Sequence, residues 1–336
     1  MNLFKTIALS ICLGAGSTFC IDAATTTPLL DSLRNAVDSG RFYFGHHDDT
    51  AYGHEREYTD DASDVLALTG KLPGMMSWDL GDIEHGVDRN LDGVPFAFIA
   101  SEVRRQHERG GLTTISWHPD NPVSGGDSWD VSTAPVSLMQ SGPAVRDSIA
   151  ACINRAADFI GDLRDAEGNR IPVIFRPWHE NTGSWFWWGA AHCTPEQYID
   201  LWRLTRRCFD EKGIDNVVWA YSPDKDLTAE KYLLTYPGDE YVDILACDIY
   251  HFNGEEGLDE YLRRADTQFA FISRMAQERG KIAAFAETGL ESLTMPDWYT
   301  AVLLPLMKRY PLAYVCVWRN ANERVLPNHY YVPFRG

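Results

Sequence analysis

Residues 171–189 join a short apolar run to a group of ionisable side chains. The run Val173–Phe175 stops at Arg176, and His179 and Glu180 follow closely. A parallel strand covered on both faces reads as a continuous apolar run. Polar groups at the exit of such a strand lie where barrel enzymes keep their catalytic residues. The pattern therefore predicts a strand that leads into a chemical site.

The same segment carries four tryptophans: Trp178, Trp185, Trp187 and Trp188. The apolar face of a pyranose ring stacks on an aromatic ring, and its hydroxyl groups need polar partners, so a carboxylate among indoles indicates a sugar site. The alternative is a tryptophan-rich core with an ion-paired Glu180. Because the rings of Trp-Phe-Trp-Trp cannot all point inward from one short segment, we favour the sugar site.

A second carboxylate, Glu287, follows the apolar run Ile282–Phe285. Retaining glycosidases need two carboxyl groups roughly 5–5.5 Å apart, one as nucleophile and one as acid and then base. Among aromatic loops Glu180 can be desolvated and stay protonated, as the acid must. Glu287 can be held ionised by donors such as Tyr250 or an arginine, and can then attack an anomeric carbon.

These residues need a scaffold that brings distant strand ends together. Helical patterns are clearest at Ala144–Leu163, Pro195–Phe209 and Leu258–Arg279, the last expected to begin after the Gly254–Gly257 loop. Alternating strands and helices indicate parallel pairing, and eight repeats predict an α/β fold, the (β/α)8 TIM barrel. An open doubly wound sheet is the alternative, but its glycine-rich phosphate turn is not in the sequence. The eight strand-like runs are Phe42–Phe44, Met75–Trp78, Thr113–Trp117, Val173–Phe175, Val217–Tyr221, Ile244–Cys247, Ile282–Phe285 and Tyr314–Val317.

The two ends of the predicted barrel differ from a regular pattern. After Trp318 only a short, proline-containing tail without helical periodicity remains, so we expect the last outer helix to be missing or truncated. The amphipathic segment Leu29–Val37 is expected to cap the opposite end of the barrel. No linker interrupts the chain, which predicts a single catalytic domain over residues 24–336.

Residues 1–23 have the features of a signal peptide. Lys5 supplies positive charge, Thr6–Gly14 is apolar but too short to span a bilayer, and Ala23 ends a plausible cleavage site. We therefore predict export to a periplasm or the medium. Lipid attachment at Cys20 is the alternative, and Phe19 is a poor fit to the small residue needed before it.

Composition limits the classes of molecule that the protein can bind. The formal net charge of −18 argues against nucleic acid and anionic membranes, and is compatible with a neutral polysaccharide. No stretch after the signal is long and apolar enough to cross a membrane. The five cysteines beyond the signal form an odd set without a Cys-x-x-Cys pair, so we expect neither a disulfide framework nor a structural zinc site. We expect a monomer.

Two further motifs resemble metal sites. His46–Asp49 places two histidines beside two aspartates, but adjacent strand residues point to opposite faces, so no more than two could share a centre. Substrate contact or simple loop polarity is the interpretation we favour. Asp88–Gly93 echoes a calcium loop without its terminal glutamate, which favours a turn. We predict no metal and no cofactor.

Several of these motifs, in their order, resemble glycoside hydrolase family 26. The resemblance covers the chain from about Phe42 to Phe334. It implies a (β/α)8 barrel and, from the best-known members, a retaining β-mannanase. The motifs that carry it are Arg-Pro-Trp-His-Glu-Asn at residues 176–181, Trp185, Asp248-Ile-Tyr250, Ala286-Glu287-Thr-Gly and Trp318-Arg319.

The resemblance also implies roles for single residues. Glu180 would be the acid/base and Glu287 the nucleophile, with His179 supporting the first and Tyr250 hydrogen-bonded to the second. The remaining implied contacts are with substrate: Trp185 and Trp318 flank the cleaved bond, His118 contacts the sugar on the non-reducing side, and Asp248 and Arg319 complete the predicted substrate-binding set.

The predicted reaction is hydrolysis of β-1,4-mannosidic bonds in mannan, galactomannan, glucomannan or manno-oligosaccharides, either within chains or with release of mannobiose. Three alternatives stay open: a related enzyme for mixed-linkage β-glucan or β-1,3-xylan, a carbohydrate-binding protein whose catalysis has decayed, and a zinc-dependent barrel hydrolase. A binding protein has no need of Glu180 and Glu287, and a zinc enzyme would lose activity in chelator.

Overall fold

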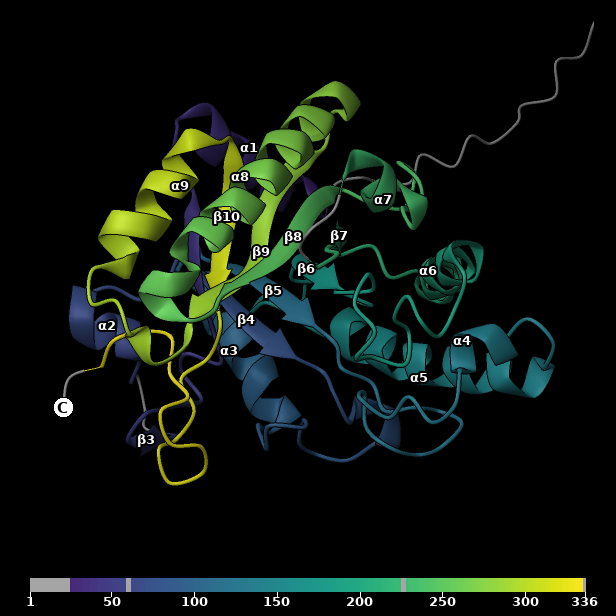
Figure 1. Cartoon of the computed structure of the whole chain (residues 1–336). Helices are drawn as coiled ribbons and strands as arrows, with labels where there is room; N and C mark the ends of the chain where they lie inside the picture. The colour runs from purple at the N-terminus through teal and green to yellow at the C-terminus, as the bar shows by residue number, and fades with distance from the viewer. Residues whose placement is uncertain (1–24, 59–61, 225–227, 335–336) are drawn as a thin grey trace, which may run out of the picture.

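The computed structural model describes residues 25–58, 62–224 and 228–334. Eight parallel strands close into a barrel in the order β1-β10-β9-β8-β7-β6-β5-β4. Helices surround the barrel strands, which run together in the middle of the molecule (Figure 1). The predicted (β/α)8 architecture is confirmed. The predicted signal segment lies outside the described residues.

All eight predicted runs overlap a barrel strand. Three strands, β1, β8 and β9, continue at least three residues further than the sequence indicated, because polar residues follow the apolar run without ending the pairing. Glu287 therefore lies within its strand, three residues before the end. The barrel strands are β1 (Tyr43–His47), β4 (Met75–Asp79), β5 (Leu112–Ser116), β6 (Val173–Arg176), β7 (Val217–Tyr221), β8 (Ile244–His251), β9 (Ile282–Leu290) and β10 (Leu312–Val317). A small hairpin, β2 (Tyr52–Gly53) and β3 (Arg56–Glu57), follows β1.

The outer helices follow the strands in turn. The predicted start of the third long helix was wrong, because α8 begins at Gly254 itself. Asn253 and Gly254 adopt positive φ there and turn the chain into the helix, and Glu255 and Glu256 suit the positive end of the helix dipole. The helices are α2 (Asp64–Thr69), α3 (Phe96–Glu108), α4 (Pro135–Leu138), α5 (Pro143–Gly161), α6 (Pro195–Glu211), α7 (Ala229–Leu234), α8 (Gly254–Arg279) and α9 (Leu304–Arg309), with one-turn segments η1 (Ile83–His85) and η2 (Glu291–Leu293) and the π-helical η3 (Trp298–Leu303).

Helix α1 (Thr27–Asp38) closes the end of the barrel at which the strands begin, as predicted. Leu29 and Leu33 are buried in the same apolar cluster as Met75, Leu112 and Ile282, the first residues of three strands. Burial of these leucines removes the barrel floor from water, which is the main stabilising term available to a short helix.

The tail after β10 packs against the barrel without forming a helix, within residues 318–334. Asn320 holds it in place, because its Oδ1 accepts from the backbone N–H groups of Tyr331 at 2.8 Å and Val332 at 2.9 Å. Its Nδ2 donates to Asp64 at the start of α2 at 2.8 Å. A buried amide thus joins the tail to the first outer helix.

Two further sequence predictions concern the described part of the chain. None of its helices has the length and apolarity to cross a membrane. Its five cysteines, Cys152, Cys193, Cys208, Cys247 and Cys316, are all free thiols.

The role of α1 predicts the effect of shortening one side chain. Leu33→Ala should lower the free energy of unfolding by about 3 kcal/mol, because it leaves a cavity at the barrel floor. Asn35→Ala, an exposed position of the same helix, should change it by no more than about 0.5 kcal/mol. Urea unfolding followed by tryptophan fluorescence measures both. Equal midpoints for the two variants would show that α1 does not belong to the core.

Candidate active site

Arg176 lies at the mouth of the barrel, at the end of β6. It follows Ile174 by two residues, and Ile174 lies in the apolar cluster of the barrel interior, so both side chains point inward. Its Nη1 donates to Asp248 Oδ2 at 2.6 Å, and its Nη2 donates to Glu287 Oε2. Burial opposes its charge, but Asp248 and Glu287 outweigh burial and raise the pKa of Arg176, which therefore stays cationic.

A β-bulge aims Glu287 at this cation. Strands β8 and β9 shift register between Cys247, which pairs with Phe285, and Asp248, which pairs with Glu287. Ala286 lies in the apolar interior cluster, so strict alternation would turn Glu287 outward. The extra residue reverses the alternation and places Glu287 beside Asp248.

Both carboxylate oxygens of Glu287 accept hydrogen bonds. Arg176 occupies Oε2, and the Tyr250 hydroxyl donates to Oε1 at 2.6 Å. Burial and the negative charge of Glu287 raise the pKa of Tyr250 well above its usual range, so the hydroxyl keeps its proton and donates it. These two donors fix the orientation of the Glu287 carboxylate.

Glu180 lies in a tight turn beyond β6 and has a positive φ of 53°. Its backbone N–H donates to Ser222 O at 2.8 Å, which anchors the turn to the end of β7. Its Oε2 accepts from the indole N–H of Trp185 at 2.8 Å. Burial, followed by the charges of Glu287 and Asp248, raises the pKa of Glu180 well above its ordinary value. A carboxyl group in this state is protonated near neutral pH and can act as an acid.

Glu180 and Glu287 line the same cavity, of about 390 Å³. Five of the seven residues predicted to bind substrate lie there too, so the structure brings together most of what the sequence singled out. The other lining residues are His118, Trp129, His179, Trp185, Phe186, Asp224, Tyr250, Phe252, Trp318 and Tyr331. A larger hollow of about 540 Å³ between α6 and α7 has no carboxyl side chain among the described residues that line it, so it lacks the paired acids of the smaller cavity.

Asp248 and Arg319 lie outside the cavity wall. Asp248 is fully buried behind Arg176 and accepts from Ser222 Oγ at 2.5 Å. Arg319 pairs with Asp92 at 2.6 Å and donates to the Tyr52 hydroxyl at 2.9 Å, beside a neighbouring hollow of about 500 Å³. Asp248 can act on the cavity through Arg176, which holds Glu287, and Arg319 can act in the neighbouring hollow.

The tryptophan-rich segment is mainly core. Trp178, Trp187 and Trp188 are buried, and Trp185 alone of the four is exposed, at 38%. The buried indoles hold the loop in shape: Trp188 Nε1 donates to His179 O at 2.9 Å, and Trp187 Nε1 donates to Pro119 O at 2.9 Å. The segment therefore combines both sequence interpretations, a packed core and one indole at the cavity.

Other rings at the cavity come from distant elements. Trp318 stacks on His47, with ring centroids 4.3 Å apart and planes 19° apart. Trp129 is 48% exposed and stacks on His118, and Phe252 is 54% exposed. Phe252 was missed by the sequence analysis, since a single aromatic residue in a loop carries no motif. Its position two residues after Tyr250 was the available signal.

The polar segment His46–Asp49 is held by hydrogen bonds within itself and to neighbouring residues. His46 Nδ1 lies 2.7 Å from Asp49 Oδ1, and His47 Nδ1 lies 2.8 Å from Ser77 Oγ. Asp48 Oδ2 accepts from the Tyr52 hydroxyl at 2.5 Å. Side-chain nitrogen or oxygen atoms of His47 and Asp48 lie within 4.8 Å of Asp92, which belongs to the Asp88–Gly93 motif. Both motifs thus lie around Tyr52 and Arg319.

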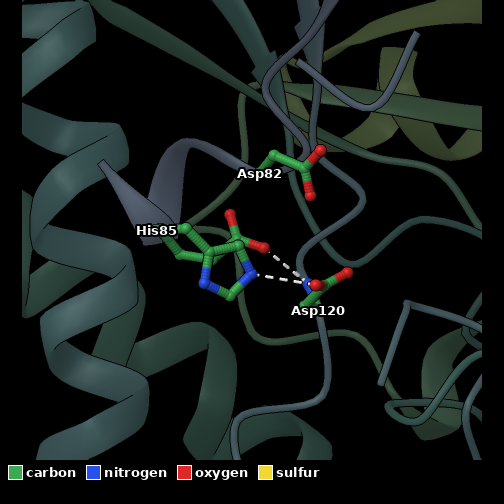
Figure 2. Close-up of side chains that lie close together, drawn as sticks. Asp82, His85 and Asp120 are labelled. Atoms are coloured by element: carbon green, nitrogen blue, oxygen red, sulfur yellow. Dashed lines mark hydrogen bonds and ion pairs between the residues drawn. The ribbon is translucent and has the colours of Figure 1, made fainter. Parts of the chain in front are cut away.

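A second polar cluster links two loops beside the cavity, and the sequence analysis did not single it out. Asp82, His85 and Asp120 converge there together with Glu84, with ligand atoms within 4.8 Å of one another (Figure 2). His85 Nε2 lies 2.8 Å from Asp120 Oδ2, and the Asp120 N–H donates to Glu84 at 2.5 Å. Burial raises the pKa of Glu84 to about 7. These contacts tie the loop after β4 to the loop that carries His118.

Comparison with known proteins points to one family. A family model described as Glycosyl hydrolase family 26 matches residues 22–296. A GH26 β-mannanase from Bacteroides ovatus superimposes with a TM-score of 0.88 and 44% identity, covering 93% of this chain and 89% of that chain. A modular endo-β-1,4-mannanase from Cellulomonas fimi superimposes with a TM-score of 0.82 and 32% identity, covering 94% of this chain and 72% of that one.

Curated relatives agree with this match. A mannan endo-1,4-β-mannosidase from Bifidobacterium adolescentis is 32% identical over 284 residues, covering 79% of this chain and 27% of the relative. Mannan endo-1,4-β-mannosidase A and B from Caldalkalibacillus mannanilyticus is 30% identical over 273 residues, covering 78% of this chain and 49% of the relative. The chain thus spans about a quarter of the first relative and about half of the second.

The contact between Trp185 and Glu180 predicts the direction of a titration change. The indole N–H donates to the carboxylate and favours its ionised form, so Trp185→Phe should raise the pKa of Glu180 further. Trp129→Phe, at the same cavity and without a bond to Glu180, should leave the titration in place. Carbon-13 NMR of labelled glutamate carboxyl groups, followed through a pH titration, measures the pKa of Glu180 in both variants. An unchanged or lowered pKa in Trp185→Phe would contradict the contact.

Proposed function

The chain belongs to glycosyl hydrolase family 26, and from that membership we propose that the protein hydrolyses β-1,4-mannosidic bonds with retention of configuration. The substrates would be mannan, galactomannan, glucomannan or manno-oligosaccharides. The names of the similar proteins from Bifidobacterium adolescentis and Bacteroides ovatus support this substrate class. The observation that carries the proposal is the contrast between two glutamates of one cavity.

Glu287 has the surroundings of a nucleophile. Its carboxylate is fixed by Arg176 and by the Tyr250 hydroxyl, and it opens onto the cavity. In the first step one of its oxygens bonds to the anomeric carbon as the glycosidic C–O bond breaks. Glu180, protonated because of its raised pKa, gives its proton to the departing oxygen, so the leaving sugar departs as an alcohol.

The second step reverses these roles. Glu180, now ionised, takes a proton from water, and the water oxygen attacks the anomeric carbon from the side that the leaving group vacated. The bond to Glu287 breaks, and its carboxylate returns to the donors of Arg176 and Tyr250. Because each step inverts the anomeric carbon, the product keeps the original configuration.

The aromatic rings supply sugar-stacking surfaces. Trp318 stacks on His47, and Trp185 donates to Glu180. Both rings line the cavity, which supports the proposal that they would flank the reacting bond. His179 and Tyr250 provide polar groups among them, and His118 contributes its ring surface. Asp248 and Arg319 act from behind the cavity wall and from the neighbouring hollow, as described above.

We also propose the wider setting that the sequence indicates. Residues 1–23 would direct export to a periplasm or the medium, and residues 24–336 would form one catalytic domain that works as a monomer. The two carboxyl groups supply both the acid and the nucleophile, so the reaction needs no metal cofactor. Activity in a chelator such as EDTA should therefore equal activity without it.

Removal of the nucleophile tests the proposal most directly. Glu287→Ala should reduce sugar release from mannan to background, because no group remains to attack the anomeric carbon. Glu211→Ala, an exposed glutamate at the end of α6, is the matched control and should retain the parent rate. Reducing-sugar assays on mannan, mixed-linkage β-glucan and β-1,3-xylan measure both the loss and the substrate class. More than a few per cent of the parent rate in Glu287→Ala, or a preference for another polysaccharide, would contradict the proposal.

Removal of the acid should separate substrates by their leaving groups. Glu180→Ala should strongly slow cleavage of mannan, whereas an aryl mannoside with an acidic phenol should still form the glycosyl-enzyme, since its leaving group needs no proton. Pre-steady-state release of the phenol measures this step. Equal losses on both substrates would show that Glu180 is not the acid.

A further inference from the structure

Asp79, at the end of β4, is a buried carboxylate that the proposed reaction leaves unused. It is 1% exposed, and each of its oxygens accepts two hydrogen bonds. Oδ1 accepts from the N–H groups of Gly81 at 2.7 Å and His118 at 3.2 Å. Oδ2 accepts from Ser116 Oγ at 2.6 Å and His118 Nδ1 at 2.7 Å. Burial opposes ionisation, but His118 and these donors outweigh it and hold the pKa of Asp79 well below its usual range.

A chain of two hydrogen bonds leads from Asp79 through His118 to His179, which precedes Glu180 in the sequence. His118 Nε2 lies 3.1 Å from His179 Nε2, and the two rings meet edge to face with centroids 4.5 Å apart. Two imidazole nitrogens at this distance share one proton, so one ring donates and the other accepts. The surrounding charges decide which ring donates.

The charges favour His118 as the donor. Burial lowers its affinity for a proton, but the charge and hydrogen bond of Asp79 outweigh burial and raise the pKa of His118. Burial and the nearby positive groups Arg176 and His118 lower the pKa of His179 well below its ordinary value. The other ionisable groups facing His118 are Glu287, which favours its charge, Arg176 and His47, which oppose it, and Asp92.

We propose that Asp79 is a positioning residue of the active site, which acts through His118 to fix the proton of His179 on Nδ1. His118 then has both ring nitrogens engaged, one with Asp79 and one with His179. Its ring N–H groups are not available to a sugar hydroxyl, so its contact with substrate is through the face and edge of the ring. The kinetic consequence rests on the proposed function, whereas the protonation pattern does not.

The chain of hydrogen bonds from Asp79 through His118 to His179, called the relay below, leaves one ring nitrogen as a defined donor. His179 Nδ1 is buried and has no hydrogen-bond partner among the described residues. Because His179 Nε2 accepts from His118, Nδ1 carries the proton and can donate to a sugar hydroxyl or an ordered water. The backbone carbonyl of the same residue is held by Trp188. Ring and main chain next to Glu180 are therefore both fixed.

Nitrogen-15 NMR of labelled histidine rings tests the protonation pattern without any substrate. At about pH 6.5, the ordinary histidine pKa, His118 should show two protonated nitrogens because its pKa is raised, and His179 should show a proton on Nδ1 only. In Asp79→Asn the amide oxygen can still accept from His118 Nδ1 but carries no charge. His118 should then lose its second proton, and the His179 proton should move to Nε2. Spectra of His118→Gln and His179→Gln assign the signals.

The kinetics of the same variant test the consequence for Glu180. The ratio of kcat/KM on mannan, parent over Asp79→Asn, should be about tenfold or more near pH 7. It should shrink below about pH 6, because acid restores the proton on His118 and with it the tautomer of His179. Ser116→Ala is the matched control: it removes another bond to Asp79 and keeps the carboxylate charge, so its loss should be smaller and independent of pH.

The outcomes separate this proposal from the one it rests on. A parent His179 protonated on Nε2, or a pattern unchanged in Asp79→Asn, overturns the relay. A rate ratio that stays constant from pH 5 to 8 also overturns it, because a merely structural loss does not follow the His118 proton. Absence of mannan cleavage in the parent would contradict the proposed function, while the NMR spectra would still decide the relay.

Discussion

A single buried guanidinium organises the mouth of the barrel. Arg176 bridges Asp248 and Glu287 with hardly any exposure to water. Desolvating charged groups costs several kcal/mol for each ion, and the cost is recovered only while the groups stay paired. Burial raises the pKa of Asp248 well above its usual range, against the opposing charge of Arg176. The arrangement is therefore a poor source of stability, but it is specific, because loss of Arg176 would leave two buried carboxyl groups without a positive partner. The position of Glu287 depends on this constraint.

The fold meets the constraint with an irregularity in one strand. In a regular barrel, side chains from β8 and β9 alternate between the interior and the outer helices, and Glu287 would point outward after Ala286. The register shift between Cys247 and Asp248 turns the glutamate back toward the axis. A bulge beside an active site is a way to re-aim one side chain without altering the rest of the sheet. In this barrel the bulge lies between the apolar interior residues, which α1 covers at one end, and the charged residues at the other end.

Much of the architecture could be predicted from the sequence, because strands covered on both faces must be apolar along their length. All eight strand runs were found in this way, and the capping by residues 29–37 was found from its amphipathic pattern. The bulge at Ala286 could not be found, since its two-to-one pairing depends on β8 and leaves no local pattern. The predicted start of α8 was also wrong, because glycines in the first turn of a helix give the same sequence pattern as a loop. The sequence could not show which tryptophans were core, since Trp185 and Trp188 differ only in tertiary surroundings.

Candidate site residues were easiest to predict where polar side chains follow strands directly. Glu180, Glu287, His118 and Tyr250 all line the cavity, and each lies at or near the exit of a strand. The partners that set their charge were harder to assign, because a buried ion pair and a surface aspartate look alike in a sequence. Asp79 shows the difference: it ends a strand like the others, yet its four hydrogen bonds come from the loop after its own strand and from β5 with the residues that follow it.

The two glutamates differ through their neighbours, because the same side chain can keep or lose its proton according to its surroundings. Arg176 supplies Glu287 with a positive partner at the barrel axis, whereas Glu180 has the neutral indole of Trp185 and lies in the negative field of Glu287 and Asp248. The charge on Glu287 therefore helps to keep the proton on Glu180. When Glu287 bonds to a sugar it loses that charge, and the force that retains the proton on Glu180 weakens. Glu180 is then the better base for the water that follows, so one electrostatic coupling favours the acid in the first step and the base in the second.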